Sequence, residues 1–233
     1  MNIWSIFDHL LACRCPLCRA HSPALCAACA RALPHNAHAC TRCALPLPTG
    51  APVDALCVDC QRRAPPFDRV LAPLLYRSPV DDLIARFKYH DRLDLGRLLS
   101  GLLCESLQAD REPRPQLLLP VPMDAQGLRR RGFNQAAELA RQVAAMLDIQ
   151  WSTTLLQRAR HVSHQRGLGR RARQRNLRGA FHCSTPPPPH VAVIDDVVTT
   201  GATAAEIAVT LKRAGAERVD IWAVARTPAT QQD

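Results

Sequence analysis

The residues best suited to chemistry lie in one stretch, "HVAVIDDVVTTGAT", at residues 190–203. Four apolar residues lead into two adjacent carboxylates, Asp195 and Asp196, and a turn rich in Thr and Gly follows. A buried strand that ends in such a turn and opens a helix directs backbone N–H groups and the positive end of the helix dipole toward one point. Gly201 lets the backbone approach a bound anion closely. The stretch therefore predicts an anion-binding site.

The ligand expected at this turn carries hydroxyls as well as an anion. No Lys follows Gly201, so the turn is not the P-loop of nucleoside triphosphatases, and the chain lacks a G-x-G-x-x-G dinucleotide motif. Two carboxylates would repel a phosphate that stood alone, but they bind hydroxyls or a metal well. A phosphorylated ribose meets both demands, with its phosphate on the turn and its ring hydroxyls on Asp195 and Asp196.

A second set of reactive side chains precedes residue 61. Eight of the eleven cysteines form four C-x2-C pairs, and two such pairs supply four thiolates to one tetrahedral metal. Eight thiolates thus predict two closed sites of the kind that holds structural zinc. The spacing allows a cross-braced arrangement, but we favour sequential pairing because short loops close at the lowest entropic cost. The eight ligands are Cys15, Cys18, Cys26, Cys29, Cys40, Cys43, Cys57 and Cys60.

The alternative interpretation of the four pairs is redox activity or simple burial.

The other cysteines and the nearby histidines are not needed as ligands. His21, His35 and His38 could each replace a thiolate, although the set of eight is already complete. The remaining thiols, Cys13, Cys104 and Cys183, are expected to be small buried residues or incidental thiols.

Charge and composition indicate a globular protein with a polyanionic partner. The 233 residues carry a formal net charge of +10, and the segment 158–178 holds eight Arg and no acid. The N-terminal "MNIWSIFDHLLAC" is interrupted by Asp8 and His9, so it lacks the long apolar core of a signal peptide, and no later segment predicts membrane insertion. We therefore expect a cytoplasmic location, where cysteines remain reduced.

The chain after the cysteine pairs alternates strands with helices. The segment 61–69, "QRRAPPFDR", predicts a linker, and we place a cysteine-rich domain at residues 1–64 and an α/β domain at 65–233. Strands are expected at 69–76, 116–122, 190–194 and 217–226; helices are expected at 78–90, 95–107, 135–147 (capped by Asn134) and 203–215 (closed by Gly215). This order favours a mainly parallel sheet that binds ligands at the carboxyl ends of its strands.

The stretch "VAVIDDVVTTGAT" resembles the signature of type I phosphoribosyltransferases, which bind phosphoribosyl pyrophosphate (PRPP) at this strand, turn and helix. With the cysteine pairs, "ARFKYHDRLDLG", "PVPMDAQGLRRRGFNQA" and "HQRGLGRRARQRNLRGAF", nearly the whole chain resembles the ComF family, and its GntX-like members in particular. The resemblance implies a type I phosphoribosyltransferase-like α/β sheet, mainly parallel and flanked by helices, with a small N-terminal double zinc-ribbon domain.

The same resemblance implies roles for individual residues. Asp195 and Asp196 would hold the ribose hydroxyls, and the 5'-phosphate would lie on Thr199, Thr200, Gly201, Ala202 and Thr203. Pyrophosphate, accompanied by Mg²⁺, would face the "PVP" turn and Arg129, Arg130 and Arg131. The planar guanidinium of Arg presents paired N–H donors that match the oxygens of pyrophosphate. The alternative interpretation of this Arg run is a solvated basic patch. The implied reaction passes through an oxocarbenium-like ribosyl cation and needs no protein nucleophile, so Asp195, Asp196 and Arg131 are the catalytic candidates.

The remaining functional question concerns the Arg-rich segment and the acceptor. Residues 161–179 match the family's mobile loop in position, but Arg side chains without acids also suit a nucleic-acid groove or a solvated face. An acceptor pocket could be lined by residues at and just after the end of the helix expected at 78–90, namely Phe87, Lys88, Tyr89 and Arg92. The alternative is that these residues form an ordinary helix end.

Two functions are therefore open, both with PRPP as ligand. One is a Mg²⁺-dependent phosphoribosyltransferase of unknown acceptor. The other is a PRPP-sensing module that binds single-stranded DNA or a DNA-uptake protein. ComF membership implies a link to natural transformation or to the use of imported DNA. Because the two domains are predicted to be separate, we expect substitution of Cys40 or Cys57 to leave PRPP binding largely intact.

Overall fold

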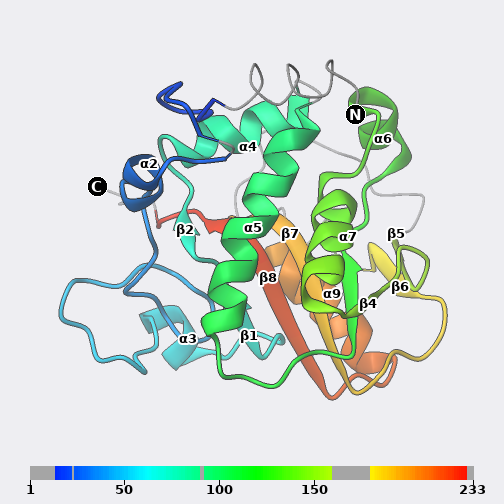
Figure 1. Cartoon of the computed structure of the whole chain (residues 1–233). Helices are drawn as coiled ribbons and strands as arrows, with labels where there is room; N and C mark the ends of the chain where they lie inside the picture. Colours follow the sequence, from blue (N-terminus) through cyan, green and yellow to red (C-terminus); the bar gives the residue numbers. More distant parts are fainter. Residues whose placement is uncertain (1–13, 23, 90–91, 159–178, 230–233) are drawn as a thin grey trace.

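The computed structural model describes residues 14–22, 24–89, 92–158 and 179–229. Its centre is a parallel sheet with the strand order β1-β8-β7-β3-β4, in which β2 also pairs with β8 (Figure 1). The strands are β1 (Arg69–Leu71), β2 (Leu74–Leu75), β3 (Leu117–Pro120), β4 (Gln150–Trp151), β7 (His190–Val198) and β8 (Arg218–Arg226).

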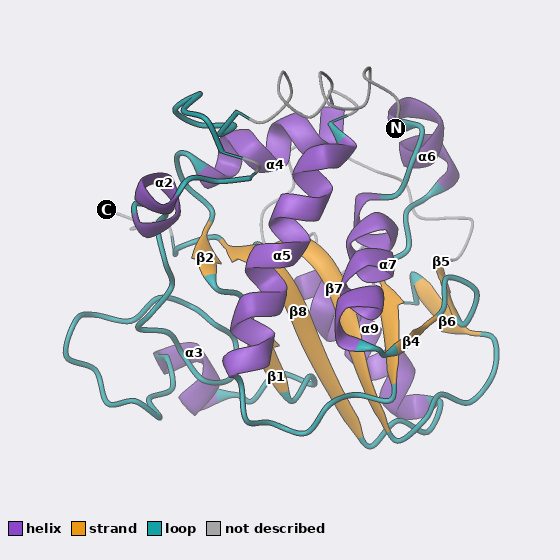
Figure 2. Ribbon diagram, viewed as in Figure 1, coloured by secondary structure: helices purple, strands orange, loops and turns teal. Residues whose placement is uncertain are grey.

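Helices cover both faces of this sheet. Figure 2 shows α5 (Leu93–Ala109) and α7 (Gln135–Leu147) in front of it and α9 (Ala202–Arg213) behind it, with α4 (Val80–Tyr89) near the upper end of α5. Alternate residues of β7 serve the two faces: Ala192 and Ile194 pack with α4, α5 and α7, whereas Val191 and Val193 pack with α9. A strand buried on both faces must be apolar at every position, which explains the unbroken run that leads to Asp195.

The expected fold class is confirmed, with local differences. Ala72 and Pro73 divide the predicted strand 69–76 into β1 and β2, because Pro cannot donate a ladder hydrogen bond. Strand β7 does not end before the carboxylates but continues through them to Val198, so Asp195 and Asp196 are strand residues. Asn134 caps α7 as predicted, since its Oδ1 accepts a hydrogen bond from the Ala136 N–H at 3.0 Å.

The described elements that were not expected from the sequence include a short helix and a two-stranded ribbon. Helix α6 (Ala125–Arg131) contains the Arg run in its last turn, and Asp124 Oδ1 caps its start by accepting from the Gly127 N–H at 2.6 Å. Strands β5 (Leu156–Arg158) and β6 (Phe181–Cys183) pair as an antiparallel ribbon. In the sequence, residues 159–178 of the Arg-rich segment lie between them. Residues 159–178 lie outside the described residues, so the interpretations of that segment remain predictions.

The cysteine-rich part contains only short helices, α2 (Ala27–Arg31) and α3 (Val58–Arg62), within the residues that the structure describes. It is hydrogen-bonded to the sheet, because the Val70 N–H donates to the Arg42 carbonyl at 2.9 Å and Asn36 Nδ2 donates to the carbonyls of Ala44 and Ala72. Within the described ranges, no helix combines the length and the apolar character that a membrane span requires.

Candidate functional site

Asp195 and Asp196 lie near the carboxyl end of β7, at the edge of the sheet where parallel α/β folds bind ligands. Asp196 is buried, and its backbone N–H donates to Asp195 Oδ1 at 2.8 Å. Burial and the neighbouring negative charge of Asp196 raise the pKa of Asp195 to about 8. Asp195 is therefore protonated near neutral pH, and a ligand or cation that favours its ionised form is bound with release of that proton.

Lys88 supplies a positive charge to this pair from α4. Its Nζ lies 2.8 Å from Asp196 Oδ2, and both side chains are largely buried. The ammonium lowers the pKa of Asp195 in opposition to the effects of burial and Asp196. The sequence indicates Lys88 only as a candidate for an acceptor pocket. The structure instead brings it to the carboxylates that are expected to hold the ribose.

The turn after β7 has the geometry expected of an anion site. Gly201 is the N-cap of α9 with φ 74°, a left-handed conformation that favours Gly, and the Ala202 N–H bonds to Thr200 Oγ1 at 3.3 Å. Among the described residues, the backbone N–H groups of Thr200, Gly201 and Thr203 have no hydrogen-bond acceptor. Free N–H groups at the start of a twelve-residue helix are the donors that a phosphate requires.

The Arg run divides into one residue that faces the protein and two that face solvent. Arg131 donates to Gln135 Oε1 at 3.0 Å and to the Tyr89 hydroxyl at 3.3 Å, and its guanidinium lies 5.2 Å from the centre of the Tyr89 ring. Its buried Nε has no hydrogen-bond partner among the described residues. Arg129 and Arg130 are exposed. Within the described chain, neither of these two arginines contacts the carboxylates.

Gln135 connects Arg131 with Lys88. This side chain is 2% exposed, and its Nε2 donates to the Lys88 carbonyl at 3.4 Å while its Oε1 accepts from Arg131. Nearby, Asn134 Nδ2 donates to the carbonyl of Val121 in the "PVP" turn, and the Val121 N–H bonds to the Ile194 carbonyl. The start of α7 and the last turn of α4 are thus joined to the end of β7. No pattern in the sequence indicates Gln135, because a polar residue in the first turn of a helix is usually exposed.

The eight expected zinc ligands form two groups of four. Cys15, Cys18, Cys26 and Cys29 make the first four-cysteine group, and Cys40, Cys43, Cys57 and Cys60 make the second; within each group the Sγ atoms lie within 4.8 Å of one another. Sequential pairing is therefore confirmed. Four converging thiols fit a tetrahedral Zn²⁺, and two four-cysteine groups suggest two structural zinc ions. Outside these groups, Cys104 is buried as predicted and Cys183 is partly exposed.

The protein already favours the thiolate at one position in each group. Burial raises the pKa of Cys40, but hydrogen bonds from the backbone of Cys57, Cys43 and Arg42 outweigh it and lower the value to about 7. Burial likewise raises the pKa of Cys15, but backbone hydrogen bonds outweigh it there too and lower the value to about 6. Burial and neighbouring thiols raise the pKa of Cys60 instead. A metal cation is needed to hold all four sulfurs deprotonated together.

Fold and site together define a parallel α/β protein with an N-terminal double zinc ribbon. The family model "Double zinc ribbon domain" matches residues 6–61. Over 220 residues the chain is 36% identical to "DNA utilization protein YhgH" of Escherichia coli K12 and of Salmonella typhi, covering 92% of this chain and 95% of each relative. It is 33% identical over 178 residues to "Competence protein F" of Haemophilus influenzae, covering 73% and 78%. The chain belongs to the ComF/YhgH family.

Solved structures of lower similarity include two phosphoribosyltransferases. A purine phosphoribosyltransferase from Pyrococcus horikoshii is 18% identical, with a TM-score of 0.33 over 58% of this chain and 75% of that one. A hypoxanthine phosphoribosyltransferase from Staphylococcus aureus is 13% identical, with a TM-score of 0.34 over 56% and 73%.

Proposed function

We propose that this protein binds Mg²⁺·PRPP at the end of β7 and acts as a phosphoribosyltransferase-type protein of the ComF family. One observation carries the proposal: a largely buried carboxylate pair adjoins a turn whose backbone N–H groups lack acceptors in the described chain. The turn suits a 5'-phosphate, and the carboxylates suit two neighbouring ribose hydroxyls. The proposed setting is the cytoplasm, where thiols remain free to bind zinc.

Lys88 gives this site a charge balance that depends on the ligand. Without ligand its ammonium neutralises Asp196. Hydroxyls that donate to Asp195 and Asp196 favour the ionised carboxylates, and the ammonium then also attracts the phosphate oxygens of the same ligand. Mg²⁺, a hard cation that prefers oxygen ligands, would supply positive charge to the pyrophosphate when bound together with the substrate.

In the proposed reaction the bond from the ribose to pyrophosphate breaks, and pyrophosphate leaves with the bonding electrons while an acceptor atom takes its place. The protein contributes orientation and charge stabilisation rather than a nucleophile. Arg131 lies beside Tyr89 and Gln135, within the cluster that contains Lys88, and it retains an unpartnered Nε in the described chain. Arg131 is therefore the proposed pyrophosphate contact, whereas Arg129 and Arg130 remain exposed candidates.

The direct test is to follow pyrophosphate release from Mg²⁺·PRPP across candidate acceptors, including nucleobases and single-stranded DNA, and to measure PRPP binding by calorimetry in parallel. We expect PRPP to bind in every case and pyrophosphate to be released with one class of acceptor. Binding without release under all conditions supports the sensing module instead. A failure to bind PRPP overturns the proposed ligand.

The second candidate is a PRPP-sensing module that binds single-stranded DNA or a DNA-uptake protein. It is favoured by the names of the relatives, "DNA utilization protein" and "Competence protein F", and by eight Arg without an acid at residues 158–178. If residues 158–178 form a nucleic-acid groove, their affinity for an oligonucleotide should fall steeply as the salt concentration rises, because binding releases counterions. Replacing Arg170, Arg171 and Arg173 with Gln should then abolish oligonucleotide binding and spare PRPP affinity. Retained oligonucleotide binding in this triple variant contradicts a groove at that segment.

A further inference from the structure

Arg226, the last residue of β8, connects two parts of the molecule that are far apart in sequence. It is 6% exposed. Its Nε donates to the carbonyl of Cys43 at 3.0 Å, and its Nη1 donates to the carbonyls of Val198 at 3.1 Å and of Thr199. Cys43 belongs to the second four-cysteine group, and Thr199 begins the anion-binding turn. One guanidinium thus holds the zinc ribbon and the turn at once.

A planar guanidinium is well suited to this task. Its donors point in fixed directions, so acceptors that bond to it simultaneously are fixed relative to one another. A buried cation also binds its acceptors strongly, because leaving a donor unsatisfied in the interior is costly. A displacement of the Cys43 carbonyl therefore changes the position of Arg226 or breaks a bond to it, and the turn loses support in either case.

Apolar packing reinforces the same connection. Ala44, next to the ligand Cys43, lies in the same buried cluster as Phe67 and Val198. The Phe67 ring lies beside the turn, 3.9 Å from the position that a Cβ on Gly201 would occupy. Phe67 follows the last cysteine of the second group by seven residues. Ala44 and Phe67, which neighbour the second group in the sequence, are therefore packed at the base of the turn, and Arg226 connects the group to the turn by hydrogen bonds.

The second four-cysteine group has only a small core of its own. Its own core consists of Cys40, Cys57 and Cys60, against which Cys43 and three partly buried leucines pack. So few apolar side chains do not supply enough buried area to fold a loop of this length, and in such small motifs metal binding is the folding free energy. Zinc therefore contributes to the place of the Cys43 carbonyl, together with the hydrogen bonds to the neighbouring carbonyls of Arg42 and Ala44.

The first four-cysteine group meets the body of the protein elsewhere. Leu17, Leu25 and Leu33 pack on the face of the sheet that α4, α5 and α7 cover. Arg86 of α4 donates to the Pro16 carbonyl at 3.2 Å. In the described part of the chain, no hydrogen bond joins this group to the turn at 199–203. The two groups are therefore not equivalent with respect to the site.

We infer that Arg226 is a positioning residue that couples zinc in the second four-cysteine group to the order of the anion-binding turn, and through it to the affinity for the phosphorylated ligand. The statement about affinity rests on the proposed function, whereas the statement about the order of the turn does not. Loss of zinc from the second group should weaken ligand binding, in contrast to the independence that the sequence predicts. The protein would then bind its ligand well only when zinc is available.

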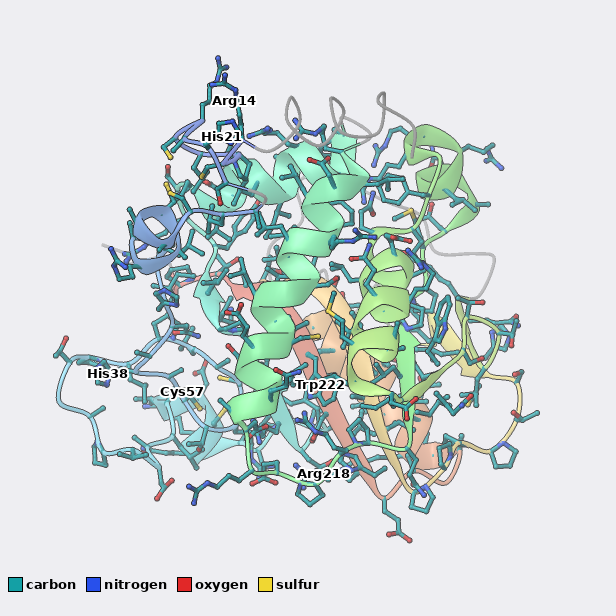
Figure 3. All side chains as sticks on the ribbon, viewed as in Figure 1. Arg14, His21, His38, Cys57, Arg218 and Trp222 are labelled. Atoms are coloured by element: carbon teal, nitrogen blue, oxygen red, sulfur yellow. The ribbon has the colours of Figure 1, made fainter. Side chains whose placement is uncertain are left out.

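Arg226→Lys and Arg226→Met test the coupling by two measurements. Hydrogen exchange of the amides at 199–203 reports the order of the turn without any ligand, and calorimetry reports the affinity for Mg²⁺·PRPP. We expect exchange about tenfold faster or more in Arg226→Met, a smaller change in Arg226→Lys, and matching losses of affinity. Arg218→Met is the matched control, because Arg218, labelled in Figure 3, lies at the other end of β8. There it bonds to Glu112 and Asp220.

The zinc part is tested by comparing Cys57→Ala, in the second group, with Cys29→Ala, in the first. Each should lose about one equivalent of metal. Only Cys57→Ala should speed exchange at 199–203. Unchanged exchange in both Cys57→Ala and Arg226→Lys overturns the inference, and so does an equal effect of Cys29→Ala. If no variant or wild-type protein binds PRPP, the proposed ligand is wrong, but the exchange measurements still decide whether the turn is coupled to zinc.

Discussion

Lys88 and Asp196 form an ion pair, with 2.8 Å between Nζ and Oδ2, at the carboxyl end of the sheet. The lysine comes from the last turn of α4 and the aspartate from β7, so the pair joins a helix to the strand that carries the candidate site. It explains how the fold tolerates two adjacent carboxylates at a largely buried position. One carboxylate is neutralised by the ammonium, and the other has its pKa raised so that it holds a proton.

Lys88→Met should destabilise the protein, because it leaves Asp196 without its partner beside Asp195. Both groups retain some exposure, so the cost should be about 1–3 kcal/mol rather than the larger penalty of a fully buried pair. The loss of the ammonium should also raise the pKa of Asp195 further. The destabilisation should therefore be greater at pH 8.5, above the pKa of Asp195 in the wild type, than at pH 5, where Asp195 is protonated with or without Lys88. Thermal unfolding at both pH values measures the difference.

The control for this variant is Arg141→Met. Arg141 pairs with Glu138 on the exposed face of α7, and such surface pairs contribute about 0.5 kcal/mol or less. An effect of Lys88→Met no larger than that of the control would show that Lys88 does not stabilise the carboxylate pair.

Asp195→Asn should make the protein more stable in alkaline solution. The folded-state pKa of Asp195 is about 8, above its ordinary value of 3.8, so the folded protein binds the proton more tightly than the unfolded chain. The contribution of this proton to the free energy of unfolding is complete below pH 3.8, the ordinary pKa, and is lost as the pH rises to about 8. An amide never ionises and avoids that loss.

Thermal unfolding between pH 5 and pH 9 tests this expectation. For a chain of this size, each kcal/mol recovered raises the midpoint by about 2–4 °C, and the gain should grow with pH. Because the replaced group belongs to the candidate site, the gain in stability should be accompanied by weaker ligand binding. A constant difference in midpoint across the pH range would contradict the raised pKa.

Asp196→Asn should weaken Mg²⁺·PRPP binding by about 10- to 100-fold, because a charge-assisted hydrogen bond to a ligand hydroxyl contributes about 1.5–3 kcal/mol. Calorimetry gives the affinity directly. Asp148→Asn serves as the control, since Asp148 is an exposed residue at the end of α7 with φ 53°, a conformation that Asn also adopts readily. Equal affinities in wild type and Asp196→Asn would exclude Asp196 from the ligand site.

Protein purified without oxygen should contain about two zinc ions per chain, because each four-cysteine group takes one. Zinc uptake by the metal-free protein should release protons, since the raised pKa of Cys60 keeps that thiol protonated without metal. Metal analysis and a pH-indicator titration measure these two quantities. Protein that is folded, reduced and free of zinc would contradict both expectations.

The sequence by itself determined the features that depend on short spacing. Cysteines separated by two residues converge because a tight turn brings them together, and loop entropy then favours the nearest pair as partner, so both four-cysteine groups were predictable. The apolar run of β7, the glycine of the turn and the Asn134 cap are local choices with local physical causes.

Only the tertiary structure decided which distant residues meet. Helical periodicity shows that α4 buries one face, but it does not show that Lys88 reaches Asp196, because that contact depends on how α4 packs over the end of the sheet. Arg226 ends an apolar strand in the sequence, with nothing to distinguish it from an exposed strand end. It becomes a connection between Cys43 and Thr199 because parallel pairing places the end of β8 beside the end of β7, and the zinc ribbon covers that corner.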